Sequence, residues 1–443
     1  MTSGFVKMPN RLPIPESSLC DCMNKNTDRR DNMAVGIIIA MMVFQTSLHK
    51  ILAGVIPAFN LSYNPPWLCV LYVLAMGAVF VLVLYPRRTS AKDWAAGHRF
   101  LLAQLLVLLL AIISVDIVTM VRGQLRLSNI ITHNLDYFYA FLVVPILILL
   151  EEKKWIFKQM LDVIMAVTLC SGIMRMLVSL YWNNTGIEIM CITRESAFEG
   201  WIRNDRLRVT APCFLLLCIP VAAFMFFKTK SLFYRLFYTI VEGFCLFYCY
   251  YIWQSRAAML YGAVCIAAMI LFIPADAKKM RLRIELCVLA AEIILAIGGL
   301  RIIMGLFSTE ESSKYFMENK GHFNVYDCFI RKYFAHPVLG DGLTETLAEW
   351  FPNGRALWLC DGGFLYSIVP MGILMIVFFL MVFSRGIYVY FKYLRVSEYA
   401  LLAFGCTVLI LVTGISMDPF FTPTAFMVPF YLAIVEYSAR GKD

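Results

Sequence analysis

Residues 100–120 read FLLAQLLVLLLAIISVDIVTM, a nearly continuous apolar stretch in which Asp116 is the single charged residue. A helix that crosses the hydrocarbon core of a bilayer needs about 20 predominantly apolar residues, so this stretch alone predicts a transmembrane helix. The rest of the 443-residue chain has the same character: 60% of its residues are hydrophobic, 16% are charged and the mean hydropathy is +0.73. Soluble domains carry roughly 25% charged residues. The composition therefore excludes a soluble enzyme, a disordered chain and a disulfide scaffold.

The same criterion predicts about twelve transmembrane helices and an all-α polytopic membrane protein. Alternating ten-residue patterns are missing, which argues against a membrane β-barrel. No apolar stretch with a small-residue cleavage site follows the N-terminus, so no removable signal peptide is expected. Residues 1–33 and 439–443 are predicted to be tails, and residues 34–438 are predicted to form the membrane domain. The predicted spans are 34–58, 67–85, 100–120, 131–150, 160–182, 211–227, 236–254, 257–275, 284–307, 362–383, 399–417 and 424–438.

Basic residues are distributed unevenly between the two sides of this predicted bundle. With the N-terminus in the cytoplasm, 24 of the 39 Lys and Arg residues fall in the inner tails and loops, beside 10 acidic residues, whereas the outer loops carry 12 basic and 13 acidic residues. The net charge of +9 thus reports topology by the positive-inside rule, and it does not indicate nucleic-acid binding. An even number of helices puts both tails in the cytoplasm. Every short inner loop is basic, with residues that include Arg87, Arg88, Lys153, Lys154, Lys228, Lys230, Lys278, Lys279, Arg281, Arg283 and Arg385.

Two outer loops are long, residues 183–210 and 308–361, whereas the other outer connections are short. Loops on a rigid scaffold are where binding and catalysis tend to occur. Arg203, Arg206 and Arg208 end the first of these loops, and Arg256 opens the eighth span. Several arginines on the outer face, against the positive-inside trend, indicate an anion site because guanidinium groups match phosphate oxygens. Arg122 and Arg126, which follow the third span, are weaker candidates. Arg175 and Arg301 lie inside spans and are expected to face the bundle interior.

Four motifs occur in a recognisable order. Arg208-Val-Thr-Ala-Pro and Gln254-Ser-Arg256-Ala-Ala-Met each open a predicted helix. Phe334-Ala-His336-Pro-Val-Leu-Gly340-Asp-Gly342 lies in the large outer loop, and Asp361-Gly-Gly-Phe-Leu-Tyr-Ser-Ile-Val-Pro-Met-Gly372 opens the helix after it. Over roughly residues 100–438 this pattern resembles the superfamily of O-antigen ligases and Wzy-type O-antigen polymerases. The His-Pro-Val-Leu-Gly-x-Gly stretch is its most specific part.

The resemblance implies a fold, a location and a class of reaction. Members are glycosyltransferases of the GT-C type in the bacterial cytoplasmic membrane, with a large extracytoplasmic loop between helices 9 and 10. They act at the outer face on oligosaccharides linked to undecaprenyl pyrophosphate, without a metal or other cofactor, and work beside flippase and chain-length regulator proteins. Ligases usually carry a His-Asn pair just before the tenth helix, where this chain reads Cys360-Asp361-Gly362. That difference favours a polymerase of capsule, exopolysaccharide or O-antigen repeat units.

The implied reaction moves a growing glycan from its lipid pyrophosphate to a hydroxyl of an incoming lipid-linked repeat unit. Preorganised Arg side chains in a water-poor site would stabilise the charge on the departing pyrophosphate. Arg208 and Arg256 are assigned this role, with Arg206 and Arg203 assisting. Asp361, at the membrane end of the large loop, is the expected general base, because a partly buried carboxylate titrates close to neutral pH.

Other expected site residues lie in the large outer loop. His336 is the alternative general base, although a His before Pro can also simply order the turn. Gly340 and Gly342 permit close approach of the backbone to a sugar or phosphate, or form a tight turn. Trp358 offers a ring for sugar stacking, and Arg331 lies near the glycines. The two outer histidines are fourteen residues apart and the acidic residues are scattered, so no metal site is expected.

Two other functions remain open. The first is transfer of the glycan to a different acceptor, as in an O-antigen ligase. The second is a transporter or flippase of lipid-linked oligosaccharide, for which charged residues inside spans are the support: Asp136, Glu285, Glu292 and Arg301. The chain shows no internal repeat of the kind found in inverted-repeat transporters, and a transporter has no need of a large outer loop.

Overall fold

The computed structural model describes residues 16–46, 66–123, 127–187, 201–203, 206–274, 279–280, 283, 321–343, 348–350, 356–358, 362–420 and 424–440. These residues are almost entirely helical, with two short antiparallel hairpins. Within them, six helices are long and apolar enough to cross a membrane, and four shorter helices are also apolar. The prediction of an all-α membrane protein is confirmed at this level, whereas the number of twelve spans stays a prediction.

Two helices of the first half of the chain follow the predicted apolar stretches closely. Helices α2 and α4 begin and end within one residue of the predicted spans 67–85 and 100–120. The first helix begins 18 residues before the predicted start at residue 34. The elements are α1 (Glu16–Gln45), α2 (Pro66–Leu84), η3 (Tyr85–Arg87), α3 (Ala91–Gly97), α4 (Arg99–Val121), α5 (Leu127–Phe138), η4 (Tyr139–Leu142), α6 (Val143–Glu152) and α7 (Lys154–Thr185).

The second half of the chain contains the two hairpins and the helices that follow them. The predicted ninth span, 284–307, lies outside the described residues, as do Glu285, Glu292 and Arg301. The elements are β1 (Trp201–Arg203), β2 (Arg206–Arg208), α8 (Leu215–Lys228), α9 (Leu232–Phe247), the π-helical turn η5 (Tyr248–Ile252), α10 (Arg256–Phe272), α14 (Gly321–Ala335), β3 (Ala348–Trp350), β4 (Ala356–Trp358), α15 (Leu365–Met371), α16 (Ile373–Tyr393), α17 (Ala400–Thr413), η8 (Ala425–Met427) and α18 (Val428–Ser438).

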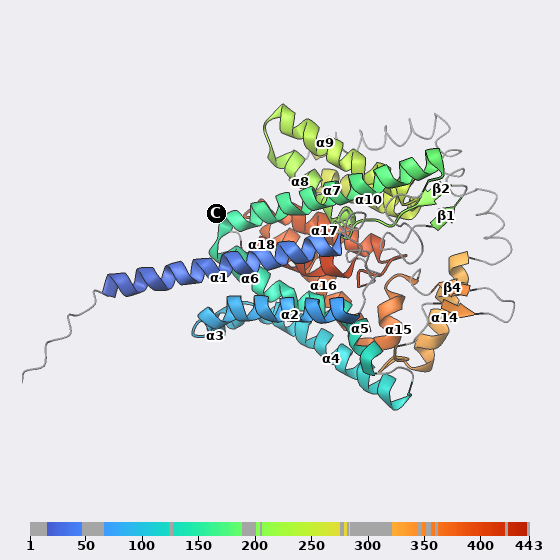
Figure 1. The fold of residues 1–443 in the computed structure, drawn as a ribbon, viewed down its shortest axis with the longest axis horizontal. Helices are drawn as coiled ribbons and strands as arrows, with labels where there is room; N and C mark the ends of the chain where they lie inside the picture. Colours follow the sequence, from blue (N-terminus) through green and yellow to red (C-terminus); the bar gives the residue numbers. More distant parts are fainter. Residues whose placement is uncertain are drawn as a thin grey trace, which may run out of the picture.

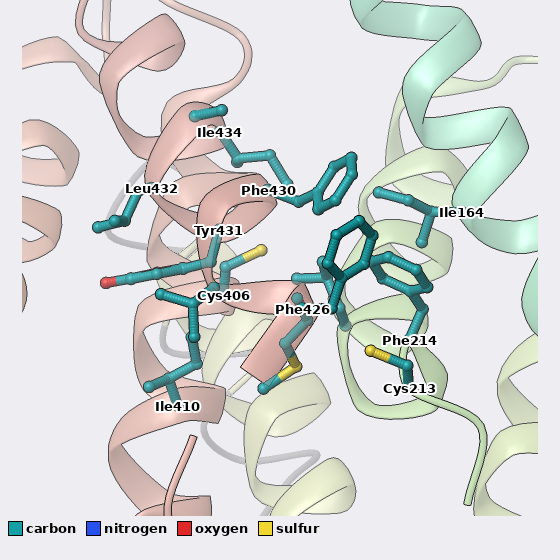
Figure 2. Close-up of a cluster of buried hydrophobic side chains, with 14 of the residues drawn as sticks. Ile164, Cys213, Phe214, Cys406, Ile410, Phe426, Phe430, Tyr431, Leu432 and Ile434 are labelled. Atoms are coloured by element: carbon teal, nitrogen blue, oxygen red, sulfur yellow. The ribbon is translucent and has the colours of Figure 1, made fainter. Parts of the chain in front are cut away.

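The centre of the bundle is formed by helices that are apolar on all sides. Every residue of α18 is buried, and so is every residue of α8 from Leu215 to Met225; a helix that is hydrophobic all round belongs in an interior. Between them, Phe214, Phe426 and Phe430 pack edge to face, with ring centroids 5.2 to 6.1 Å apart (Figure 2). Such aromatic pairs contribute about 0.5–1.5 kcal/mol beyond the area they bury.

One end of the bundle holds the C-terminus and α3, and the opposite end holds both hairpins and α14 (Figure 1). One basic residue from each of four predicted inner loops is ion-paired. Arg87 and Lys153 both bind Asp31 of α1, whose side chain is 1% exposed, at 2.9 and 3.1 Å. The other two pairs are Lys228 with Glu398 and Arg385 with Glu436. Asp31 and Glu436 are buried, and because a buried charge is costly unless it is paired, their contacts hold the helix ends together.

The predicted tenth span, 362–383, is not one helix. It is broken at Gly372 into α15 and α16, and Gly372 has a backbone φ of +67°. The loop of residues 336–343 docks on this break: the Asp341 amide donates to the Val369 carbonyl at 2.9 Å, and the Ile373 amide donates to the Val338 carbonyl at 3.3 Å. A single span was the wrong prediction because the apolar composition continues across the break, which Pro370 and Gly372 form locally and the docked loop covers.

Topology gives the first testable prediction. Reporter domains fused after Ser231, in the basic α8–α9 connection, and after Glu318, in the large loop, are expected to report opposite sides of the membrane, with Ser231 cytoplasmic. Alkaline phosphatase and fluorescent-protein fusions measure this directly, with a fusion after Arg440 as the cytoplasmic reference. A cytoplasmic signal from Glu318 would contradict an outer site in this loop.

Candidate functional site

The first part of the candidate site is the β1–β2 hairpin before α8. Its register pairs Trp201 with Arg208 and Arg203 with Arg206, so positions 206 and 208 share one face of the strand and position 207 lies on the other. Leu207 is buried, and the end of α7 binds it at both backbone groups. The Leu207 amide donates to the Asn183 side chain at 2.7 Å, and Ser179 donates to the Leu207 carbonyl at 2.8 Å. Packing of Leu207 inward therefore sets the strand that carries Arg206 and Arg208.

The second part is the junction between α9 and α10. Helix α9 ends in the π-helical turn η5, a feature that recurs at functional sites. Gln254 then takes a left-handed backbone with φ of +51°, which is uncommon for a residue other than glycine. Ser255 caps α10 by accepting a hydrogen bond from the Ala258 amide at 3.3 Å. Arg256 is the first residue of α10 and is half-buried.

These two parts meet through Arg208. The Arg208 Nε donates to the carbonyl oxygen of Trp253 at 2.5 Å, three residues before Arg256. The Val209 amide donates to the Ile252 carbonyl at 3.2 Å. The structure thus brings Arg208 to the start of α10, the helix that Arg256 opens.

Buried groups below this junction fix its position. Arg175 of α7 is 3% exposed and donates to the Thr210 carbonyl at 2.8 Å and to the Thr46 carbonyl at 3.2 Å. Tyr248 donates to the same Thr210 carbonyl at 2.9 Å. As expected, Arg175 faces the interior of the bundle. Its bonds to backbone carbonyls tie α1, α7 and the segment after β2 together beneath Arg208.

The glycines of the His-Pro-Val-Leu-Gly-Asp-Gly stretch pack against the chain itself. Gly340 has φ of +79° and Gly342 has φ of +84°. A Cβ at Gly340 would collide with the carbonyl oxygen of Pro370, and the Gly342 amide donates to that same oxygen at 3.2 Å. These glycines therefore form a tight turn, and their backbone packs closely against the break between α15 and α16.

A separate cluster joins this loop to α4. Arg122, just past the end of α4, donates to the Asp341 carboxylate at 2.7 Å and to the Asp341 carbonyl at 2.6 Å. His336 is exposed, and its Nε2 lies 3.9 Å from the same carboxylate. The Leu343 amide donates to Thr119 of α4 at 2.9 Å. His336 thus belongs to a cluster that anchors the loop, and Arg122, a weaker candidate from the sequence, is its cation.

The last part of the site is the link between α17 and η8. Its residues Gly414–Phe420 are called the 414–420 link below. The Phe364 amide, before α15, donates to the Gly414 carbonyl at 2.8 Å, and Tyr261 of α10 donates to the Ser416 hydroxyl at 2.9 Å. Asp418 is fully buried, and this burial raises the pKa of its carboxyl group to about 7. In the sequence, this Asp opens the Asp418-Pro-Phe-Phe-Thr-Pro segment between the last two predicted spans, a segment expected to line the same cavity.

The other predicted site residues fall into three groups. Arg331 is exposed on α14 and pairs with Asp327 one turn away at 2.5 Å, so it is engaged on the surface of its own helix. For Arg203, Arg206 and Trp358 the structure gives only their backbone positions in the hairpins. Asp361 lies outside the described residues; Gly362, which follows it, packs against Phe329 of α14.

Within the described part of the chain, no three His, Cys, Asp or Glu side chains are grouped so that they could hold a metal ion. No known family model and no curated protein matches this chain. The helical membrane fold is therefore shown by the chain's own structure, and its activity is a proposal.

Proposed function

We propose that this protein is a polysaccharide polymerase that joins undecaprenyl-pyrophosphate-linked repeat units at the outer face of the bacterial cytoplasmic membrane. The observation that carries the proposal is the hydrogen bond from Arg208 to the Trp253 carbonyl. It brings a second guanidinium group to the helix start that Arg256 occupies. A helix N-terminus favours negative charge, so two arginines at this position suit a pyrophosphate.

The proposed reaction is a displacement at the anomeric carbon of the growing glycan. The acceptor hydroxyl oxygen forms the new glycosidic bond, and the bond from the anomeric carbon to the pyrophosphate oxygen breaks. The electron pair leaves with the lipid pyrophosphate, whose developing charge Arg208 and Arg256 stabilise. The hydroxyl proton passes to the general base, for which Asp361 is proposed. Fixed cationic donors act at the moment of reaction without having to reorganise.

The test supplies purified protein with lipid-linked repeat units extracted from polymerase-deficient cells, in the presence of EDTA. A ladder of longer lipid-linked glycans is the expected result, because the arginines take the role that a divalent cation would have in neutralising pyrophosphate. The control is the Arg256→Ala protein under the same conditions. A ladder that forms only after Mg²⁺ or Mn²⁺ is added would contradict metal independence. Products that form only on a different acceptor, such as lipid A core, would identify a ligase.

A further inference from the structure

The 414–420 link contacts the elements on both sides of the candidate site. It binds α10 through Ser416, which accepts a hydrogen bond from Tyr261, five residues after Arg256 on that helix. It binds α14 of the large loop through Tyr326, which donates to the Ile415 carbonyl at 2.5 Å. It binds the segment before α15 through the Phe364 amide. One short link therefore fixes the start of α10 relative to the start of α15.

Asp418 is the polar centre of this link. Its Oδ1 accepts from the Phe420 amide at 2.7 Å, and its Oδ2 accepts from the Ser367 amide in the first turn of α15 at 3.1 Å. The Ser367 hydroxyl in turn lies 3.0 Å from the Tyr137 hydroxyl of α5. Asp418, Ser367 and Tyr137 are each at most 4% exposed. Both carboxylate oxygens are thus used as acceptors by buried amides, which would be costly to leave unpaired.

We propose that Asp418 is a positioning residue for the transfer reaction. Its bond to the Ser367 amide ties the first turn of α15, which directly follows the Asp361–Phe364 segment in the chain, to the 414–420 link, and its bond to the Phe420 amide orders that link. Because the same link binds α10 through Ser416, Asp418 holds α15 in register with Arg256. This inference rests on the proposed polymerase function. Asp418 has no exposed surface and touches no substrate. It acts through the backbone of α15, where a displacement of about 1 Å can cost roughly 100-fold in rate.

The two-acceptor geometry needs the ionised carboxylate, because a protonated acid turns one of its oxygens into a donor. Among the described residues, Asp418 interacts electrostatically with Asp136 and Tyr137 on α5, and Tyr137 in turn with Tyr366 on α15. Helix α16 contributes the aromatic rings of Phe378 and Phe379 around Phe420. The pKa of Asp418 is about 7. The fraction of enzyme with an ionised Asp418, called the aligned form below because both amides are then bound, therefore rises as the pH rises through 7.

Stability has the opposite pH dependence. The pKa of Asp418 is raised from 3.8 in the unfolded chain to about 7 in the folded protein, so the folded protein binds more protons between these values. The contribution of Asp418 to the free energy of unfolding therefore falls as the pH rises from about 4 to 7. The aligned form is held at a cost in stability, as is common where function requires a strained or charged group.

The experiment measures elongation of lipid-linked repeat units by the full-length protein from pH 5.5 to 8.5. Asp418→Asn can satisfy only one of the two amides, because its NH₂ group is a donor. We expect its kcat at pH 8 to fall about 100-fold with KM close to the wild-type value, and the activity rise near pH 7 to disappear. Ser367→Ala keeps the amide but removes a hydroxyl that lowers the pKa of Asp418, so its activity rise should move to higher pH.

The matched control is Glu436→Gln, which changes another buried carboxylate, paired with Arg385 at the opposite end of the bundle. It should lower Tm but leave kcat and the pH profile unchanged. A wild-type kcat and pH profile in Asp418→Asn, an unmoved profile in Ser367→Ala, or the same loss in Glu436→Gln would each overturn the positioning role. Failure of the wild-type protein itself to elongate would refute the proposed function instead.

Discussion

Arg256→Ala and Arg208→Ala are each expected to abolish polymer in cells and to lower elongation by purified protein about 10²–10³-fold, the usual loss on removing one preorganised transition-state donor. Arg256 opens α10, and Arg208 reaches the same junction through the Trp253 carbonyl. Lys should restore little activity at either position, because an ammonium gives a point charge and cannot bind two oxygens in a forked geometry. Polymer is measured on gels of cell extracts, and protein abundance by immunoblot.

The control for the arginine prediction is Arg235→Ala. Arg235 is exposed near the start of α9, where it donates to the Thr229 carbonyl at 2.9 Å, at the α8–α9 connection that is predicted to be cytoplasmic. Its loss removes the same charge and should leave elongation near the wild-type rate. Near-normal polymer in both Arg208→Ala and Arg256→Ala would remove the arginines from the mechanism. Equal losses in all three variants would show a general effect of charge.

Asp361→Asn is expected to lower elongation about 10²–10⁴-fold, the range that a general base contributes. The amide keeps the shape of the side chain but does not accept the hydroxyl proton. Single repeat units on lipid pyrophosphate should accumulate in cells, because their synthesis and transfer across the membrane precede this step. His336→Ala should have a smaller effect, since His336 lies beside Asp341 in the cluster that anchors the loop.

The matched control for Asp361 is Asp327→Asn. Asp327 is an exposed carboxylate on α14, paired with Arg331 one turn away, and exposed pairs of this kind contribute only about 0.3–0.5 kcal/mol. This variant should elongate normally. If Asp361→Asn elongates at the wild-type rate, the general base lies elsewhere and His336 becomes the leading candidate.

Composition alone determined the class of fold. The helices α2 and α4 coincide with their predicted spans because uninterrupted apolar stretches of about 20 residues have no stable alternative to a helix in a bilayer. The same reasoning located the helix that Arg256 opens, because its apolar stretch predicts a span at 257–275 and α10 begins one residue earlier. The interior position of Arg175 also follows from the sequence, because a charge within a span avoids lipid.

Contacts between distant segments decided the rest. Pro370 and Gly372 mark the break at Gly372 locally, but the docking of residues 338–342 on it is a contact between distant segments. The approach of Arg208 to α10 depends on Leu207 packing against α7, and the pairing of Arg122 with Asp341 joins residues 219 positions apart. Local sequence specifies helices because their hydrogen bonds are local. Only tertiary packing decides which buried polar groups meet, because each must find its partner elsewhere in the chain.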